Sequence, residues 1–196
     1  MLESLIELDK EALLFFNSFH TPWLDPIMFW ITKTFFWLPL YGFLLFLVIK
    51  HFKKDSWIVL IGIAITILLS DQITSGFMKP FFARLRPSRE PSLQGLVYLV
   101  NGYTGGKYGF ASSHAANTFA TALFFWMLFK DQYRWLWVLF LWAVVMTYSR
   151  VYLGVHYPGD IIVGMLVGFG AAFTGYKIQR WIWYKKNKPD DVVSSG

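Results

Sequence analysis

The chain has 196 residues, of which 56% are hydrophobic and 20% aromatic, while only 15% are charged. A soluble domain averages about 25% charged residues, so the composition excludes a disordered chain, a coiled coil and a disulfide scaffold. No cysteine is present, which excludes thiolate metal sites and cysteine nucleophiles. The net charge of +6 is compatible with nucleic-acid binding, but basic residues beside apolar segments more often mark the cytoplasmic loops of a membrane protein. We therefore expect one membrane-embedded domain over residues 1–196, with the bilayer as its partner and no nucleic-acid ligand.

Residues 2–18 have the pattern of an amphipathic helix. Charged residues recur at helical spacing along one side, and leucine and isoleucine fill the other side. Acidic residues dominate the first eleven positions, which is the wrong charge for a cleaved secretory leader. The pattern predicts a helix that lies on the membrane surface. A helix packed across the ends of a bundle fits the pattern nearly as well.

Five apolar stretches follow, and each approaches or reaches the roughly 17–25 residues that a spanning helix needs. They are 26–49, 57–77, 112–129, 133–149 and 160–176. The first contains Pro39, where we expect a kink. The last three reach spanning length only with polar residues at their ends, which indicates that those ends carry function. The expected fold class is all-α: an integral membrane bundle of about five transmembrane helices plus the N-terminal helix, with a polar cytoplasmic tail over 185–196.

The basic residues are distributed unevenly between the two ends of such a bundle. Five spans bring the loops 50–56 and 130–132 and the C-terminus to one side. That side collects ten of the eighteen basic residues: Lys50, Lys53, Lys54, Lys130, Arg134, Lys177, Arg180, Lys185, Lys186 and Lys188. The positive-inside rule then makes this side cytoplasmic and the opposite side external.

The first polar segment of the external side is KPFFARLRP, which contains Lys79 and Arg86. Two cations that close on a common point form an anion clamp, in which arginine offers a bidentate fork and lysine a point charge. A single cation at a helix end more often only extends its charge to the lipid headgroups. We expect Arg84 and Arg89 to extend to the lipid headgroups in this way.

The second segment, FASSHAANTF, opens the third predicted span. Ser112 or Ser113 is a suitable N-cap, and the amides of a first helical turn can bind phosphate. Capping alone would explain both serines. It does not explain His114, an ionisable side chain in that same turn.

The third segment, SRVYLGVHYPGD, places Arg150 at the end of the fourth span and His156 in the loop that follows. Asp160 is a plausible N-cap for the fifth span. It also lies four residues after His156 across a Pro-Gly turn, a spacing that lets the carboxylate bind one imidazole nitrogen. The other nitrogen would then be free to act as a nucleophile or base.

These segments together resemble the signature of the type 2 phosphatidic acid phosphatase superfamily, a group of membrane lipid phosphatases. The family pattern has three blocks: Lys, six residues and Arg-Pro; then Pro-Ser-Gly-His; then Ser-Arg, five residues, His, three residues and Asp. Lys79 with Arg86 matches the first block, and Arg150, His156 and Asp160 match the third.

The second block departs from that pattern, because Ala111 and Ser113 stand where the family has Pro and Gly. Ser113 would either crowd the approach of a phosphate oxygen or add a hydroxyl donor. His114 retains the family's histidine.

The resemblance implies hydrolysis of a lipid phosphate or diphosphate through a phosphohistidine. In this mechanism His156 attacks phosphorus, Asp160 holds its tautomer and His114 protonates the departing oxygen. The phosphate oxygens would be held by Lys79, Arg86, Ser112, Ser113 and Arg150.

No cofactor and no metal are expected. A two-metal phosphatase needs clustered carboxylates, and the external ends offer little beyond Glu90 and Asp160. Asp71 lies within the second span, where a carboxylate normally has a partner, and we expect a structural ion pair with Lys79 or Arg150.

The expected substrate keeps its lipid tail in the bilayer, while residues 88–110 form a rim over its headgroup. Isoprenyl diphosphate, phosphatidylglycerophosphate, phosphatidate and lipid A all fit, and the short chain leans slightly toward the first two. The expected location is the inner membrane of a bacterium, with several spans and the site facing the periplasm or exterior. Two alternatives stay open: a vanadate-dependent haloperoxidase-like enzyme with the same pocket, and a non-catalytic membrane protein that binds anionic headgroups.

Overall fold

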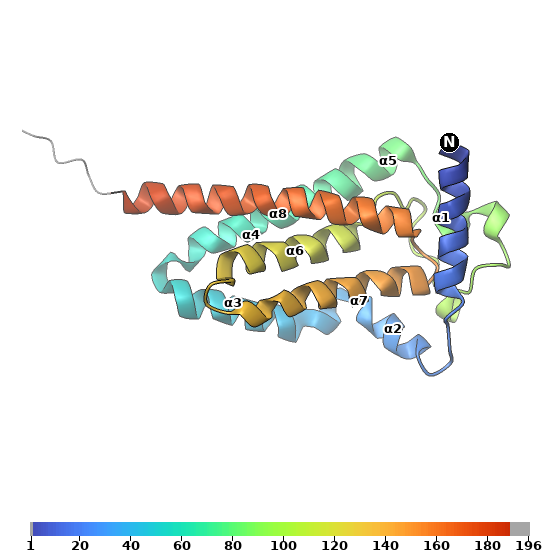
Figure 1. The fold of residues 1–196 in the computed structure, drawn as a ribbon, viewed down its shortest axis with the longest axis horizontal. Helices are drawn as coiled ribbons and strands as arrows, with labels where there is room; N and C mark the ends of the chain where they lie inside the picture. Colours follow the sequence, from blue (N-terminus) through green and yellow to red (C-terminus); the bar gives the residue numbers. More distant parts are fainter. Residues whose placement is uncertain (1, 189–196) are drawn as a thin grey trace, which may run out of the picture.

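The computed structural model describes residues 2–188 and is built from helices (Figure 1). The α-helices are α1 (Leu2–Asn17), α2 (Asp25–Ile31), α3 (Leu38–Phe52), α4 (Ser56–Asp71), α5 (Lys79–Phe82), α6 (Ser113–Phe129), α7 (Val138–Tyr152) and α8 (Pro158–Asn187). A π-helical segment over Gln72–Met78 joins α4 to α5 without a break. The described part of the chain is therefore all-α, as the composition and periodicity predicted.

Three helical stretches are long and apolar enough to cross a membrane: Thr34–Phe82, Arg134–Tyr152 and Pro158–Asn187. The first of them includes both α3 and α4, which turn back on each other at the short 3₁₀ helix Lys53–Asp55 (Figure 1). Large apolar side chains stay exposed on several helices: Phe46, Leu68, Leu141, Leu166 and Phe173. So many exposed large apolar side chains on long apolar helices are typical of a surface that faces lipid. The protein is a multi-pass membrane protein.

The first predicted span does not form one continuous helix. Helix α2 ends at Ile31, Lys33 adopts an extended conformation (φ −82°, ψ 123°), and a 3₁₀ turn over Thr34–Trp37 leads into α3. The kink expected at Pro39 is therefore wrong, because this proline lies in the first turn of α3, where its missing N–H has no helical partner to lose. The break lies six residues earlier and leaves Thr32 in the interior of the bundle.

Helices α6 and α8 form the centre of the bundle, and glycines allow their close approach. A β-carbon on Gly164 would lie 2.4 Å from the carbonyl oxygen of Ser112, and one on Gly168 would lie 2.3 Å from that of Ala116. Small residues four positions apart are a common way for membrane helices to pack closely. This contact sets where the N-terminus of α6, with His114, lies relative to the first turn of α8.

Two groups of connecting segments lie at opposite ends of the bundle. The α3–α4 turn, the α6–α7 turn and the C-terminal part of α8 lie at one end, and the segments 83–111 and 153–157 lie at the other (Figure 1). Helix α8 continues through Lys185 to Asn187, so the start of the predicted polar tail is still helical. The rest of that tail, 189–196, lies outside the described residues.

Helix α1 runs across the ends of α7 and α8 (Figure 1). Leu13 is fully buried in a cluster with Leu93, Val151 and Tyr157. The buried amide of Asn17 donates to the carbonyl oxygen of Tyr152 over 2.8 Å. The packed arrangement is thus the better of the two interpretations of this segment. Contact of its exposed leucine and phenylalanine side chains with the membrane surface stays a prediction.

Candidate active site

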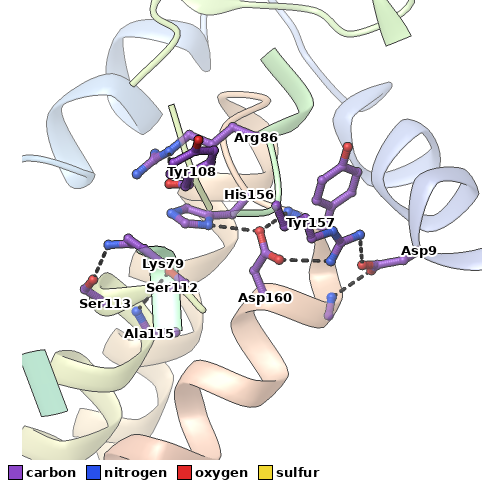
Figure 2. A network of polar contacts seen from close by, with 12 residues as sticks. Asp9, Lys79, Arg86, Tyr108, Ser112, Ser113, Ala115, His156, Tyr157 and Asp160 are labelled. Atoms are coloured by element: carbon purple, nitrogen blue, oxygen red, sulfur yellow. Dashed lines mark hydrogen bonds and ion pairs between the residues drawn. The ribbon is translucent and has the colours of Figure 1, made fainter. Parts of the chain in front are cut away.

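The three polar segments of the sequence meet at one end of the bundle (Figure 2). Lys79 begins α5, Arg86 lies in the loop after it, and Ser113 begins α6. His156 lies in the turn between α7 and α8, and Asp160 in the first turn of α8. Figure 2 shows the side chains of Lys79 and Arg86, from the first polar segment, on the same side as His156 from the third. The convergence that the spacing predicted is present.

His156 and Asp160 form a buried pair. The Nδ1 atom of His156 lies 3.2 Å from Oδ2 of Asp160, and the backbone N–H of Tyr157 donates to the same oxygen over 3.1 Å. The two side chains are 1% and 0% exposed. A carboxylate acceptor fixes the proton on Nδ1, which leaves the lone pair on Nε2.

His156 is held in its neutral form by its surroundings. Burial, together with the positive charges of Arg86, Arg150, Lys79 and Arg84, lowers the pKa of His156 well below its usual 6.5. A protonated imidazole has no lone pair, so this field keeps the lone pair of Nε2 available.

We predict that His156 stays neutral when the pH falls through 6.5, because a lowered pKa means that the proton binds only at more acidic pH. An NMR titration of ¹⁵N-labelled histidine side chains in detergent would measure this, with His156→Asn used to assign the signal. The spectrum should show the proton on Nδ1 at neutral pH. A His156 signal that titrates at or above 6.5 would contradict this description of the site.

Arg86 is positioned by the loop that faces it. Its Nε–H donates to the carbonyl oxygen of Tyr108 over 3.1 Å, while its buried Nη1 has no partner among the described residues. Gly105 and Gly109 make room for the side chain, since a β-carbon on Gly105 would lie 2.6 Å from Nη1. Burial and the neighbouring Arg150 lower the pKa of Arg86. A lowered pKa means that the charged form of Arg86 is disfavoured, and an anion placed between the two guanidinium groups would stabilise that form.

Arg150 is 2% exposed and comes from the last turn of α7. Its Nη1 donates to Oγ1 of Thr32 over 2.5 Å, and the ring centroid of Tyr103 lies 5.7 Å from its guanidinium carbon. Its Nε is buried with no partner in the described part of the chain. The break between α2 and α3 therefore has a structural role, because it presents Thr32 to this arginine.

Lys79 and Ser113 belong to one hydrogen-bonded cluster. The Lys79 Nζ donates to Oγ of Ser113 over 2.5 Å and to Oγ of Ser75 over 3.1 Å. Ser75 in turn donates to Oδ1 of Asp71 over 3.1 Å. The Ser113 hydroxyl thus lies beside Lys79 and Ser75, and its effect on a phosphate oxygen stays a prediction.

The ion pair expected for Asp71 is not formed. No Lys or Arg nitrogen in residues 2–188 lies within 4.0 Å of its carboxylate, and Lys79 is reached only through Ser75. The π-helical segment Gln72–Met78 lies between the two residues and changes the helical register that the prediction assumed.

Ser112 and His114 have different roles at the N-terminus of α6. Ser112 is the N-cap of α6: its Oγ accepts the N–H of Ala115 over 3.4 Å, and its own N–H donates to the carbonyl oxygen of Asp160 over 3.0 Å. Its side chain thus caps α6, and its backbone N–H joins that end of α6 to α8. His114 faces the cavity next to these residues, within electrostatic range of His156 and Lys79.

A cavity of about 590 Å³ extends from this site into the apolar part of the bundle. Its polar end includes Lys79, Arg86, Ser113 and His114. Its walls continue between α3, α4 and α6 along Leu44, Leu60, Ile63, Ile67 and Phe125. A charged group at one end and an apolar channel behind it match a lipid with an anionic headgroup.

Arg84 was expected to contact headgroups, and this expectation is wrong. Its two terminal nitrogens bind Asp160 at 3.0 Å and Asp9 at 2.8 Å. Asp9 and Gly109 were also missed; a β-carbon on Gly109 would lie 2.9 Å from Oδ2 of Asp160. One feature of the sequence could have indicated that Arg84 belongs to the site. Arg84 lies two residues before Arg86 in the same loop.

Comparison with known proteins agrees with the geometry. Residues 56–184 match the PAP2 superfamily. The chain is 41% identical over 187 residues to a lipid A 4'-phosphatase of Bacteroides thetaiotaomicron, covering 94% of this chain and 79% of that protein. It is 36% identical over 190 residues to a lipid A 4'-phosphatase of Porphyromonas gingivalis, covering 92% and 79%. The crystal structure of Aquifex aeolicus LpxE has a similar fold, with a TM-score of 0.68 at 24% identity, over 87% of this chain and 95% of that one.

Proposed function

The chain belongs to the PAP2 superfamily and is a membrane lipid phosphatase, and we propose that its substrate is lipid A, from which it removes the 4'-phosphate. Two relatives named for this activity each align with more than nine-tenths of the chain. They favour lipid A over isoprenyl diphosphate and phosphatidylglycerophosphate, the two substrates that the short chain slightly favoured in the sequence analysis. The cavity supports a sugar headgroup as well, because Asp71 and Asn117 line it beyond the cations.

The observation that carries the reaction is the buried contact between His156 and Asp160, with Nδ1 and Oδ2 3.2 Å apart, beside the cations Lys79, Arg86 and Arg150. In the proposed complex, Lys79, Arg86 and Arg150 bind the non-bridging phosphate oxygens with the help of Ser113 and the first-turn amides of α6. Phosphoryl transfer depends mainly on positioning and on stabilising charge on the equatorial oxygens. Ser112 contributes as the cap that fixes this turn.

In the first step, the Nε2 lone pair of His156 forms a bond to phosphorus while the bond from phosphorus to the lipid oxygen breaks. His114 donates its proton to that oxygen, so the lipid leaves as an alcohol. The negative charge of the bound phosphate favours the protonated form of His114 before transfer. Asp160 stabilises the positive charge that develops on His156.

In the second step, water attacks the phosphohistidine. His114 takes a proton from the water, and the bond between phosphorus and Nε2 breaks. Inorganic phosphate leaves, and His156 returns to its neutral form with the proton still on Nδ1. The proton that His114 gained serves the next cycle.

The proposed topology has five crossings, formed by α3, α4 with α5, α6, α7 and α8. Helix α6 has 17 residues, which is near the lower limit of about 17–25 residues for a span. The end that holds the α3–α4 and α6–α7 turns is proposed as cytoplasmic, because most basic residues gather there. The site then faces the periplasm or exterior of a bacterial inner membrane.

The substrate assignment is tested with the purified chain in detergent, supplied with bisphosphorylated lipid A, phosphatidate and isoprenyl diphosphate. Lipid A should give the highest kcat/KM, and mass spectrometry of the product should locate the loss at the 4' position. Equal or greater efficiency on isoprenyl diphosphate, or loss of the 1-phosphate, would contradict the assignment.

We also expect phosphate release to proceed at an unchanged rate in EDTA. Residues 2–188 contain no group of three or more His, Asp and Glu side chains arranged to hold a metal ion. The charge stabilisation that a metal would supply is provided by Lys79, Arg86 and Arg150. A rate that falls in chelator and returns with added Mg²⁺ would refute this expectation.

A further inference from the structure

Arg84 connects the N-terminal helix to the pair of residues that perform the proposed reaction. Its Nη1 donates to Oδ1 of Asp160 over 3.0 Å, and its Nη2 donates to Oδ2 of Asp9 over 2.8 Å. We propose that Arg84, held in place by Asp9, is a positioning residue that keeps Asp160 ionised and directed at His156. The expected effect on turnover rests on the proposed function, whereas the expected effect on the state of His156 does not.

Asp160 needs a charged partner because it is fully buried. Its Oδ2 is shared by the N–H of Tyr157 and the imidazole of His156, while its Oδ1 has Arg84 as the partner found in the described chain. A buried carboxylate without an opposite charge favours its neutral form. A protonated Asp160 would be a poorer acceptor for Nδ1–H, and the imidazole would no longer be restricted to one tautomer.

Arg84 is itself held in a fixed orientation. Its guanidinium carbon lies 3.9 Å from the ring centroid of Tyr157, so the planar group stacks on that ring. Asp9 binds it from α1, and the other oxygen of Asp9 accepts the N–H of Gly159 over 2.7 Å. The same carboxylate therefore orients Arg84 and attaches α1 to the first turn of α8. Figure 2 shows Asp9 beside Tyr157 and Asp160.

Arg84 does not line the cavity that contains Lys79 and Arg86. It lies behind Asp160, on the side of the groove between α1 and α8. Both of its terminal nitrogens are bound by carboxylates of the chain, so replacing it should change the state of His156 rather than remove a group that is free to bind substrate. The charged and titratable groups around Asp160 are Asp9, Lys79, Arg84, Arg86, His156 and Tyr157.

The test uses the full chain with Arg84→Gln, Arg84→Lys and Asp9→Asn. Glu7→Gln is the matched control, because Glu7 lies on the same helix and pairs only with Lys10, at 2.9 Å, among the described residues. Each variant is measured for kcat and KM on the lipid substrate. The ¹⁵N spectrum of the His156 ring is recorded for each as a readout that does not depend on turnover.

Arg84→Gln should lower kcat by about 10- to 100-fold with little change in KM, because misplacing a reacting group by about 1 Å can cost about 10²-fold. Its His156 spectrum should show a mixture of tautomers. Arg84→Lys should restore the Nδ1–H signal and part of kcat, since it keeps the charge but cannot bind both carboxylates. Asp9→Asn should give a smaller loss of kcat, and Glu7→Gln should behave as the unmodified chain.

Two results would overturn the proposal: Arg84→Gln with unchanged kcat and an unchanged His156 spectrum, or Arg84→Lys as impaired as Arg84→Gln in both readouts. If the unmodified chain released no phosphate from any lipid, the proposed function would fail. A tautomer change in Arg84→Gln would then still support the positioning role. If Arg84→Gln did not fold, Arg84→Lys and Asp9→Asn would decide the question by the same two readouts.

Discussion

Replacing His156 with alanine should reduce phosphate release by at least about 10⁴-fold, the scale seen when a covalent nucleophile is removed from a hydrolase. The reason is chemical, because Nε2 of this imidazole is the atom proposed to bond to phosphorus. Released phosphate, measured on lipid substrate under single-turnover conditions, provides the test.

Two further variants separate the chemistry from the fold. His156→Asn keeps a side-chain amide near Asp160 and should be as inactive as the alanine variant, with a thermal unfolding temperature closer to the original. His51→Ala removes a histidine that contacts Phe52 and Phe129 near the α3–α4 turn, far along the bundle from the site. This control should retain activity. Activity within tenfold of the unmodified chain in either His156 variant would exclude His156 as the nucleophile.

Arg86→Lys should lower kcat/KM by about 10²- to 10³-fold, even though it preserves the charge. The buried Nη1 of Arg86 has no partner in the described chain, and the side chain is held by the carbonyl of Tyr108 and by the space at Gly105. Lysine cannot supply the two parallel N–H groups that match phosphate oxygens.

The matched control for this prediction is Arg89→Lys. Arg89 lies three residues away in the same loop, and its Nη2 donates to Thr104 on the exposed surface over 3.0 Å. Its replacement should leave kcat/KM unchanged. If Arg86→Lys retained the original efficiency, or if both variants lost the same amount, Arg86 would not be a phosphate-binding residue.

The part of the site that could be predicted from sequence is the part that depends on local spacing. His156 and Asp160 are separated by one Pro-Gly turn, so their contact is determined within five residues. The start of α6 and the end of α7 were predictable, because Ser112 caps the first and the loop that carries His156 follows the second. Helices that alternate in direction then bring these ends to one end of the bundle (Figure 1).

The contacts that could not be predicted join segments with no shared periodicity. Arg84 and Asp9 are 75 residues apart, and nothing in either segment specifies the other. Their pairing depends on how α1 lies over α8, which is determined by the burial of Leu13 and the hydrogen bonds of Asn17. The break at Lys33 is similar, because the polar partner that favours it, Arg150, is more than one hundred residues away.

The most direct test of the central claim is to identify the phosphorylated residue during turnover. The chain is mixed with ³²P-labelled lipid, quenched within milliseconds in alkali and digested for mass spectrometry. We predict an acid-labile phosphate on His156, which forms and decays at rates compatible with kcat and is absent from His156→Asn. Turnover without any phosphorylated protein, or with the phosphate on another residue, would contradict the account.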